Sequence, residues 1–186
     1  DNTLNTGRIY MYDHWGSLEG DNLLNKIRYM VTACGCSFII LDHISIVVSG
    51  IEEGDERRTI DNLMTKLRGL VEEVNCGLIL VSHLKRPQGN KGHEDGAQTS
   101  MAQLRGSASI GQLSDIVIGC ERDQQGDDPD RTTVRVLKNR WTGETGVACE
   151  LDYDRKTGRL TEVPKDEMPF DEEEVDESWS GDSTVF

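Results

Sequence analysis

An aspartate and a histidine each follow an apolar run that is typical of a buried strand. Residues 37–41 (SFIIL) lead into Asp42, and residues 78–82 (LILVS) lead into His83. If the two runs are parallel strands of one sheet, both side chains lie at its carboxyl edge, where α/β proteins bind nucleotide phosphates. The aspartate would suit Mg²⁺ held through water, and a neutral imidazole would suit a phosphate oxygen. The alternatives are an aspartate that caps the following turn and a histidine satisfied in the core.

A basic, glycine-rich segment begins two residues after His83 and spans residues 85–100. Long basic side chains, with a glycine that allows close backbone approach, suit the sugar-phosphate track of single-stranded DNA. The alternative is an ordinary solvated loop. The residues that could form such a positive lining are Lys85, Arg86, Lys91, Arg105 and Gly106.

Two further pairs of residues lie at expected strand ends. Lys138 and Arg140 are two positions apart on one strand, so they share a face just before a tight turn. Such a pair can reach the γ-phosphate of a nucleotide on a neighbouring subunit, as an arginine finger does. The alternative is a surface strand with charges at period two. Arg122 and Tyr153 stand at other strand ends, where they could bracket a base.

The pattern of apolar residues predicts an α/β fold. It consists of a mostly parallel sheet flanked by helices, closed by a carboxyl-terminal antiparallel meander. The strand after the second helix lacks alternation, so we expect it to be buried on both faces. The expected helices cover residues 21–33, 55–74 and, with an interruption, 100–113; the expected strands cover residues 7–13, 37–42, 78–83, 115–120, 132–138, 147–153 and 160–163.

Composition places the chain among globular proteins. Its 186 residues are 35% hydrophobic and 29% charged, and no stretch approaches the roughly 20 apolar residues of a membrane span. We therefore expect no membrane association. The five cysteines form no CxxC pair, which indicates reduced thiols in a cytoplasmic protein.

Charge is concentrated in the last residues. The net charge is −14, and residues 165–186 contribute nine acids and one lysine. A tail this acidic and poor in apolar residues is expected to be disordered. We therefore divide the chain into residues 1–163, one folded domain, and residues 164–186, an acidic tail. The overall acidity argues against non-specific duplex binding, although it allows a narrow basic channel.

Taken together, these segments resemble the carboxyl-terminal helicase domain of phage replicative helicase–primases, in the DnaB-like hexameric family with a RecA-like core. The resemblance covers nearly all of residues 8–160. It rests on ILDHISIVVS (40–49), DERRTIDNLMTKLRGL (55–70), HLKRPQGNKGHEDG (83–96), QLRGSASIGQLSD (103–115), ERDQQGD (121–127) and LKNRWTGETG (137–146).

The resemblance implies roles for individual residues. Asp42 would be the Walker B carboxylate for Mg²⁺, and His83 the γ-phosphate sensor coupled to the DNA loop. Arg140 would be the finger supplied in trans, with Lys138 as its companion. The remaining implied contacts are Arg122 and Tyr153 with the nucleotide, Lys85, Lys91, Arg105 and Gly106 with single-stranded DNA in the ring's channel, and residues 171–177 and Phe186 with the replicative polymerase.

The implied function is that of a ring helicase that uses ATP or dTTP with Mg²⁺ to move 5′→3′ along one DNA strand. The implied location is the cytoplasm of a phage-infected bacterium. The chain lacks a GxxxxGK[ST] loop, the usual phosphate cradle, so we expect that loop and the catalytic glutamate to lie upstream of Asp1. We therefore expect little nucleotide binding or hydrolysis by the chain alone. Gly111 occupies a position where some relatives carry an arginine.

Two other functions fit the same pattern. A RecA-like recombinase or repair ATPase would share Asp42 and the apolar strands, but would form open filaments on DNA. A non-catalytic adaptor would use the acidic tail to recruit a polymerase. From composition alone, the tail is equally well explained as a solubilising segment.

Overall fold

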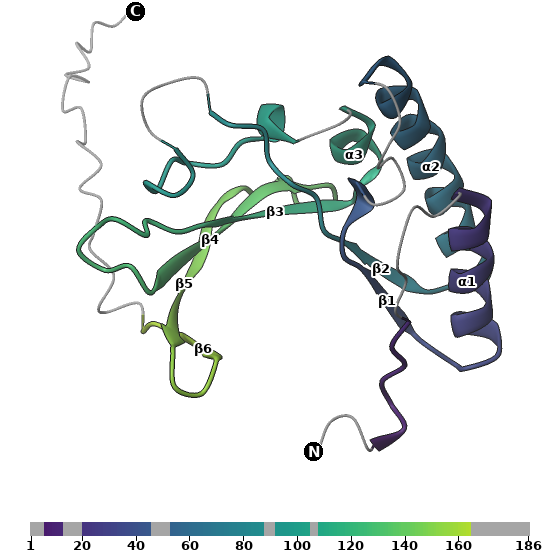
Figure 1. The fold of residues 1–186 in the computed structure, drawn as a ribbon, viewed down its shortest axis with the longest axis horizontal. Coiled ribbons are helices and arrows are strands. Elements are labelled where there is room, and N and C mark those ends of the chain that lie inside the picture. The colour runs from purple at the N-terminus through teal and green to yellow at the C-terminus, as the bar shows by residue number, and fades with distance from the viewer. Residues whose placement is uncertain (1–5, 13–19, 46–52, 88–91, 105–107, 165–186) are drawn as a thin grey trace, which may run out of the picture.

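The computed structural model of the chain describes residues 6–12, 20–45, 53–87, 92–104 and 108–164. Figure 1 shows α1 and α2 beside the β1–β2 pair, and β3 to β6 extending away as a second, curved sheet. The elements, in chain order, are α1 (Gly20–Thr32), β1 (Phe38–Leu41), α2 (Glu53–Val74), β2 (Gly77–Leu80), a 3₁₀ helix η3 (Met101–Gln103), α3 (Ala108–Leu113), β3 (Ile116–Glu121), β4 (Arg131–Asn139), β5 (Gly146–Asp154) and β6 (Arg159–Glu162).

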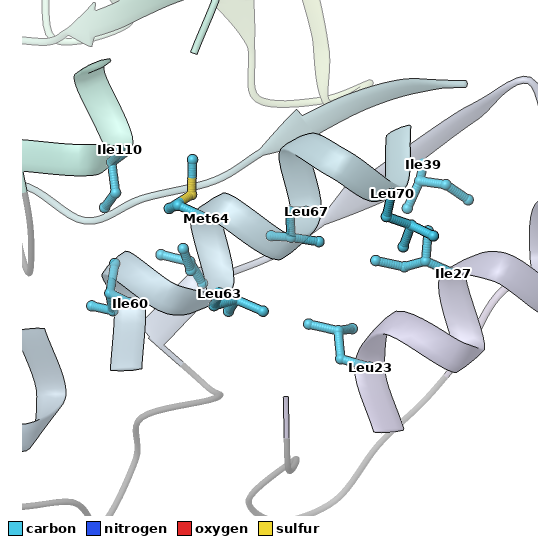
Figure 2. Close-up of a cluster of buried hydrophobic side chains, with 10 residues drawn as sticks. Leu23, Ile27, Ile39, Ile60, Leu63, Met64, Leu67, Leu70 and Ile110 are labelled. Carbon is cyan, nitrogen blue, oxygen red and sulfur yellow. The ribbon is translucent and has the colours of Figure 1, made fainter. Parts of the chain in front are cut away.

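The main core lies between α1, α2 and one face of β1 (Figure 2). Its α2 side is an apolar stripe at spacings of three and four, which is the pattern that predicted this helix. After Val74, Asn75 takes a positive φ of 52°, a conformation that asparagine tolerates better than most residues at a helix end. The buried core residues on these elements are Leu23, Ile27, Ile39, Ile60, Leu63, Met64, Leu67 and Leu70.

The strands β1 and β2 pair in parallel, with Leu41 opposite Leu80. This confirms the expected strand–helix–strand unit. The expectation that the second strand is buried on both faces is wrong for this chain. Among the described residues, helices cover the face that carries Ile39. On the other face, Ile79 of β2 is 54% exposed, and Phe38 and Ile40 of β1 are 71% and 69% exposed. The described residues leave this second apolar face bare.

The antiparallel meander expected over residues 132–163 is confirmed as β4–β5–β6. The strand expected over residues 115–120, β3, pairs antiparallel with β4 and so adds a fourth strand to this sheet. It does not join the parallel pair. Within the described residues β1–β2 and β3–β6 are two separate sheets, so the expected single sheet is wrong in this respect. The edge of β3 that faces away from β4 has no strand partner among the described residues.

Two local expectations differ from the structure. Residues 7–12 are irregular, because no described strand lies beside them to complete a ladder. The helix expected over residues 100–113 is interrupted, as expected, but its first part is the 3₁₀ helix η3 and its second part, α3, already begins at Ala108; residues 105–107 lie outside the described part.

Candidate functional site

Asp42 and His83 leave the same edge of the β1–β2 pair. Asp42 directly follows β1, and the two chains stay paired beyond the strands: Val81 N donates to Leu41 O at 2.9 Å, and Ile44 N donates to Val81 O at 3.1 Å. The ring of His43 meets the ring of His83 edge-on, with centroids 4.3 Å apart. Asp42 and His83 therefore both leave this edge and are both exposed there, as the spacing predicted.

This edge offers the exposed carboxylate of Asp42 as a candidate metal ligand. Among the described residues, no group of three or more histidine, cysteine, aspartate or glutamate side chains could enclose a metal. The exposed carboxylate of Asp42 is compatible with Mg²⁺, which keeps several waters and is bound by one or two carboxylates together with substrate phosphates. Asp42 would hold it, and the ion would neutralise phosphate charge.

The basic segment is fixed at the same edge. Leu84 and Leu104 form an isolated antiparallel bridge, and Lys85 N donates to Gln103 O at 2.7 Å. His93 Nε2 lies 2.9 Å from Lys85 O, to which it can donate. Both ends of the segment therefore meet next to His83, and Lys85 is exposed there. Three of the residues assigned to DNA contact, Lys91, Arg105 and Gly106, lie outside the described residues.

A buried acidic side chain ties the far part of this segment to the second sheet. Glu121 of β3 accepts hydrogen bonds from Thr99 N and Oγ1, at 2.8 and 2.7 Å. It also accepts two from Arg135 of β4, at 2.8 and 3.1 Å. Burial on its own would raise the pKa of Glu121, but the hydrogen bonds from Arg135 and Thr99 outweigh it and hold the pKa below its usual value. We did not anticipate this network from the sequence.

Arg140 lies at the exposed tip of β4. Its side chain is 60% exposed, and its guanidinium Nη1 donates to Asp115 Oδ1 at 3.2 Å. Its main-chain N donates to Asp115 O at 2.9 Å. The guanidinium is therefore not buried in the interior of its own subunit. The expected role in trans requires this exposure, because the side chain must reach another subunit.

Lys138 is more firmly engaged than its expected role suggests. Its ammonium donates to three carbonyl oxygens within and after α3: Gly111 O at 2.8 Å, Gln112 O at 3.0 Å and Ser114 O at 2.7 Å. An ammonium has three donors, and all three have acceptors here. In this structure Lys138 caps the carboxyl end of α3, so contact with a phosphate remains a prediction.

Arg122 and Tyr153 come together as expected. The Arg122 guanidinium lies 5.7 Å from the centroid of the Tyr153 ring, and it donates to Pro129 O at 2.6 Å and to Asp130 Oδ1 at 2.8 Å. Arg122 directly follows β3, at the end of the strand. Asp115 directly precedes β3, and Arg140 lies beside it at the start of the strand. Six residues of strand separate the two clusters by about 20 Å.

Two charged residues near Arg140 were not singled out from the sequence. Asp115 accepts hydrogen bonds from both Arg140 and Arg68, and the Arg68 contact joins Nη1 to Oδ2 at 2.5 Å. The hydrogen bond from Arg68 is the main reason that the pKa of Asp115 lies below its usual value. The only sequence signal was an aspartate immediately before an apolar strand, a position for which we had expected only a strand boundary.

None of the helices in the described ranges is long and apolar enough to cross a membrane.

Comparison with known proteins identifies the family. Residues 2–162 match the model of the DnaB-like helicase C-terminal domain. The chain is 48% identical over 152 residues to the DNA helicase/primase of Enterobacteria phage T3, which covers 82% of this chain and 27% of that protein. The chain therefore spans about a quarter of the length of this relative.

Solved structures show the fold. One of them, an ATPase domain, has a TM-score of 0.65 at 18% identity, covering 82% of this chain and 54% of that one. A DnaB-like replicative helicase, solved for its interactions with primase, gives the same score and identity over 82% of this chain and 36% of that one. A KaiC-like protein from Pyrococcus horikoshii OT3 has a TM-score of 0.59 at 18% identity, covering 85% of this chain and 61% of that one.

The fold is RecA-like, with a parallel unit that carries Asp42 and His83 beside an antiparallel sheet that carries Arg140. With the family match over residues 2–162, it follows that this chain belongs to the DnaB-like helicase C-terminal domain family.

Proposed function

We propose that this chain is part of a ring-shaped replicative DNA helicase, which couples nucleoside triphosphate hydrolysis to 5′→3′ movement on single-stranded DNA. The observation that carries the proposal is the shared edge of Asp42 and His83, with a basic segment fixed beside it. If His83 senses the γ-phosphate, its place two residues before the DNA-binding segment would let it couple nucleotide hydrolysis to DNA binding. The family match favours the helicase over the recombinase and the adaptor.

At the nucleotide, Asp42 would hold Mg²⁺ through water beside the phosphates of ATP or dTTP. His83 would donate a hydrogen bond to the γ-phosphate. The pair of Arg122 and Tyr153 would contact the base, with the tyrosine ring stacking on it. The half-buried guanidinium of Arg122, fixed by Pro129 and Asp130, supports this assignment because it gives the ring a rigid neighbour.

At the DNA, the proposed contacts are made from the segment that the Leu84–Leu104 bridge closes and from the two residues that follow Leu104. Lys85 is exposed at its start. Ring helicases pass one strand through a central channel, so a basic segment within an acidic protein would confine the attraction for phosphate to that channel. The residues proposed to contact single-stranded DNA are Lys85, Lys91, Arg105 and Gly106.

The bare apolar face supports a further part of the proposal. Parallel sheets are normally covered on both sides, and Phe38 and Ile40 are open on the uncovered side. The chain also covers only 54% of the solved ATPase domain that it matches at a TM-score of 0.65. We propose that a preceding segment of the complete protein packs on this face and supplies the phosphate-binding loop and the catalytic glutamate.

Two proposals rest on the sequence alone. The acidic tail, with Phe186 at its end, would dock the replicative polymerase. The complete protein would act in the cytoplasm of the infected host cell.

Arg140 gives the sharpest test. We propose that it reaches the γ-phosphate bound by the neighbouring subunit of a hexameric ring, because its guanidinium is exposed at a strand tip and uses one donor on Asp115. In the complete protein, Arg140→Ala should lower DNA-stimulated hydrolysis by about 10³-fold or more. Nucleotide affinity, measured by equilibrium binding, should change little.

The matched control is Arg28→Ala, which removes another exposed, ion-paired arginine on α1. It should leave turnover near normal. An Arg140→Ala protein that forms rings and hydrolyses nucleotide at the normal rate would contradict the proposed role.

A further inference from the structure

The carboxylate of Asp115 lies between two guanidinium groups at the start of β3. Arg68 of α2 donates to Oδ2, and Arg140 donates to Oδ1 at 3.2 Å. The carbonyl of Asp115 also accepts the main-chain N–H of Arg140 at 2.9 Å. One aspartate therefore fixes both the backbone and the side chain of the residue proposed as the finger.

The two guanidinium groups are held unequally. Arg68 makes the short contact with Asp115, and its Nε also pairs with Glu72 one turn along α2 at 2.9 Å. Arg140 makes a single, longer hydrogen bond to the aspartate and is more exposed. Arg68 thus anchors Asp115 to the core helix, and Asp115 in turn holds Arg140.

The geometry leaves Arg140 able to bind a second anion. A guanidinium has five donors in a fixed fork, and the contact with Asp115 uses one of them. The main chain at the tip is rigid: Trp141 N and Thr142 N donate to Asn139 Oδ1, and Gly143 N donates to Asn139 O. The carboxylate of Asp115 accepts from one donor of the Arg140 guanidinium and so restricts the direction of that group. The other donors remain for an anion of a neighbouring subunit.

We propose that Asp115 is a positioning residue that orients Arg140 toward the nucleotide of the neighbouring subunit, with Arg68 as its anchor. This inference rests on the proposed function of Arg140. Small misplacements of a catalytic group are costly, since about 1 Å can lower a rate by about 100-fold. Asp115→Asn, which removes the charge and keeps the shape, should therefore lower kcat for DNA-stimulated hydrolysis by about 10- to 100-fold. The KM for nucleotide should stay within about twofold.

The decisive measurement is a double-mutant cycle in the complete protein. If Asp115 acts through Arg140, then Asp115→Asn should have no further effect on kcat in an Arg140→Ala background. If the two losses multiply, Asp115 acts on something else and the proposal is overturned. The proposal is also overturned if Asp115→Asn alone keeps more than about half of the normal kcat.

Two variants guard against a purely structural explanation. Glu73→Gln removes the carboxylate of another arginine pair, Arg28 with Glu73, and should leave kcat unchanged. If Asp115→Asn does not fold, Asp115→Glu replaces it in the same cycle: it keeps the charge but moves it by one methylene. It should lower kcat by at least about tenfold, and only when Arg140 is present; normal kcat would overturn the proposal.

The finger and its positioning residue fail in different ways. If Arg140→Ala itself keeps normal turnover, the proposed finger is wrong and the role of Asp115 is lost with it. If Arg140→Ala is inactive but Asp115→Asn is fully active, only the positioning role is wrong.

Discussion

At the scale of single residues, the site depends on which side chains the backbone makes neighbours. Asp42 and His83 are far apart in sequence, but the parallel register of Leu41 with Leu80 brings their strand ends together. His83 is exposed and lies two residues before Lys85. If His83 meets a phosphate as proposed, a change in that contact would move the first residue of the basic segment.

This arrangement predicts a separation of binding from coupling. In the complete protein, His83→Ala should leave nucleotide affinity nearly unchanged, because Mg²⁺ and the phosphate loop would still hold the triphosphate. The affinity for single-stranded DNA should lose its dependence on nucleotide, since the link to Lys85 is cut. Fluorescence anisotropy of labelled DNA, with and without a non-hydrolysable triphosphate, measures this. A variant whose DNA affinity still rises normally with nucleotide would contradict the coupling role.

The types of the site residues were readable from the sequence, but their ion partners were not. Asp42, His83 and Arg140 stand out because each follows or ends a strand pattern. Asp115 and Arg68 are 47 positions apart, and no local pattern pairs an aspartate before a strand with an arginine on a distant helix. The same holds for Glu121 with Thr99 and for the three carbonyl acceptors of Lys138.

At the scale of elements, the network at Glu121 joins the basic segment to the antiparallel sheet. The side chain of Glu121 is only 9% exposed, and it accepts hydrogen bonds from Thr99 of the basic segment and from Arg135 of β4. The hydrogen-bond network around Glu121 therefore depends on the charge of this one carboxylate. Protonation of the carboxylate should weaken the network, so the stability of the protein should depend measurably on pH.

The folded state lowers the pKa of Glu121 below the ordinary value of 4.5. The ionised Glu121 side chain therefore contributes its full stabilisation at pH values above 4.5. This stabilisation is lost as the pH falls through the lower pKa of the folded state. Glu121→Gln should destabilise the chain by about 1–3 kcal/mol at neutral pH and make its unfolding free energy fall less steeply in acid. Denaturant unfolding at a series of pH values measures both effects.

Glu144→Gln, in the exposed turn between β4 and β5, is the control. Its unfolding free energy should show the same pH dependence as that of the unaltered chain. An unaltered slope in the Glu121→Gln variant would show that the network does not respond to this charge.

Local periodicity predicted most elements well. The α2 stripe and the alternation of β4 and β5 need only neighbouring residues to be recognised. The stripe marks a buried helix face, whereas the alternation located two strands without marking a buried face, since all nine residues of β4 are half-buried. Periodicity failed where a partner strand decides the outcome. Residues 7–12 have the composition of a strand but no described neighbour to pair with, and β3 pairs with β4 instead of extending the parallel sheet.

At the scale of the whole molecule, the two sheets and the bare apolar face indicate a domain that needs further polypeptide. An apolar run predicts burial but does not say which chain provides it, and for this reason the expectation for β2 was wrong here. The proposed phosphate-binding segment would cover Phe38 and Ile40, and the proposed ring would bring Arg140 to a neighbour. The catalytic site would then lie at the interface between two subunits.

A subunit-mixing experiment with the complete protein tests this central claim most directly. Asp42→Asn subunits would lack the Mg²⁺ carboxylate but keep the finger, and Arg140→Ala subunits would lack the finger but keep the carboxylate. Rings of either variant alone should be inactive. Random mixed rings should recover hydrolysis up to about a quarter of the normal rate, because about that share of interfaces joins an intact site to an intact finger. If mixed rings form and remain inactive, Asp42 and Arg140 do not complete one site across a subunit boundary, and the account is wrong.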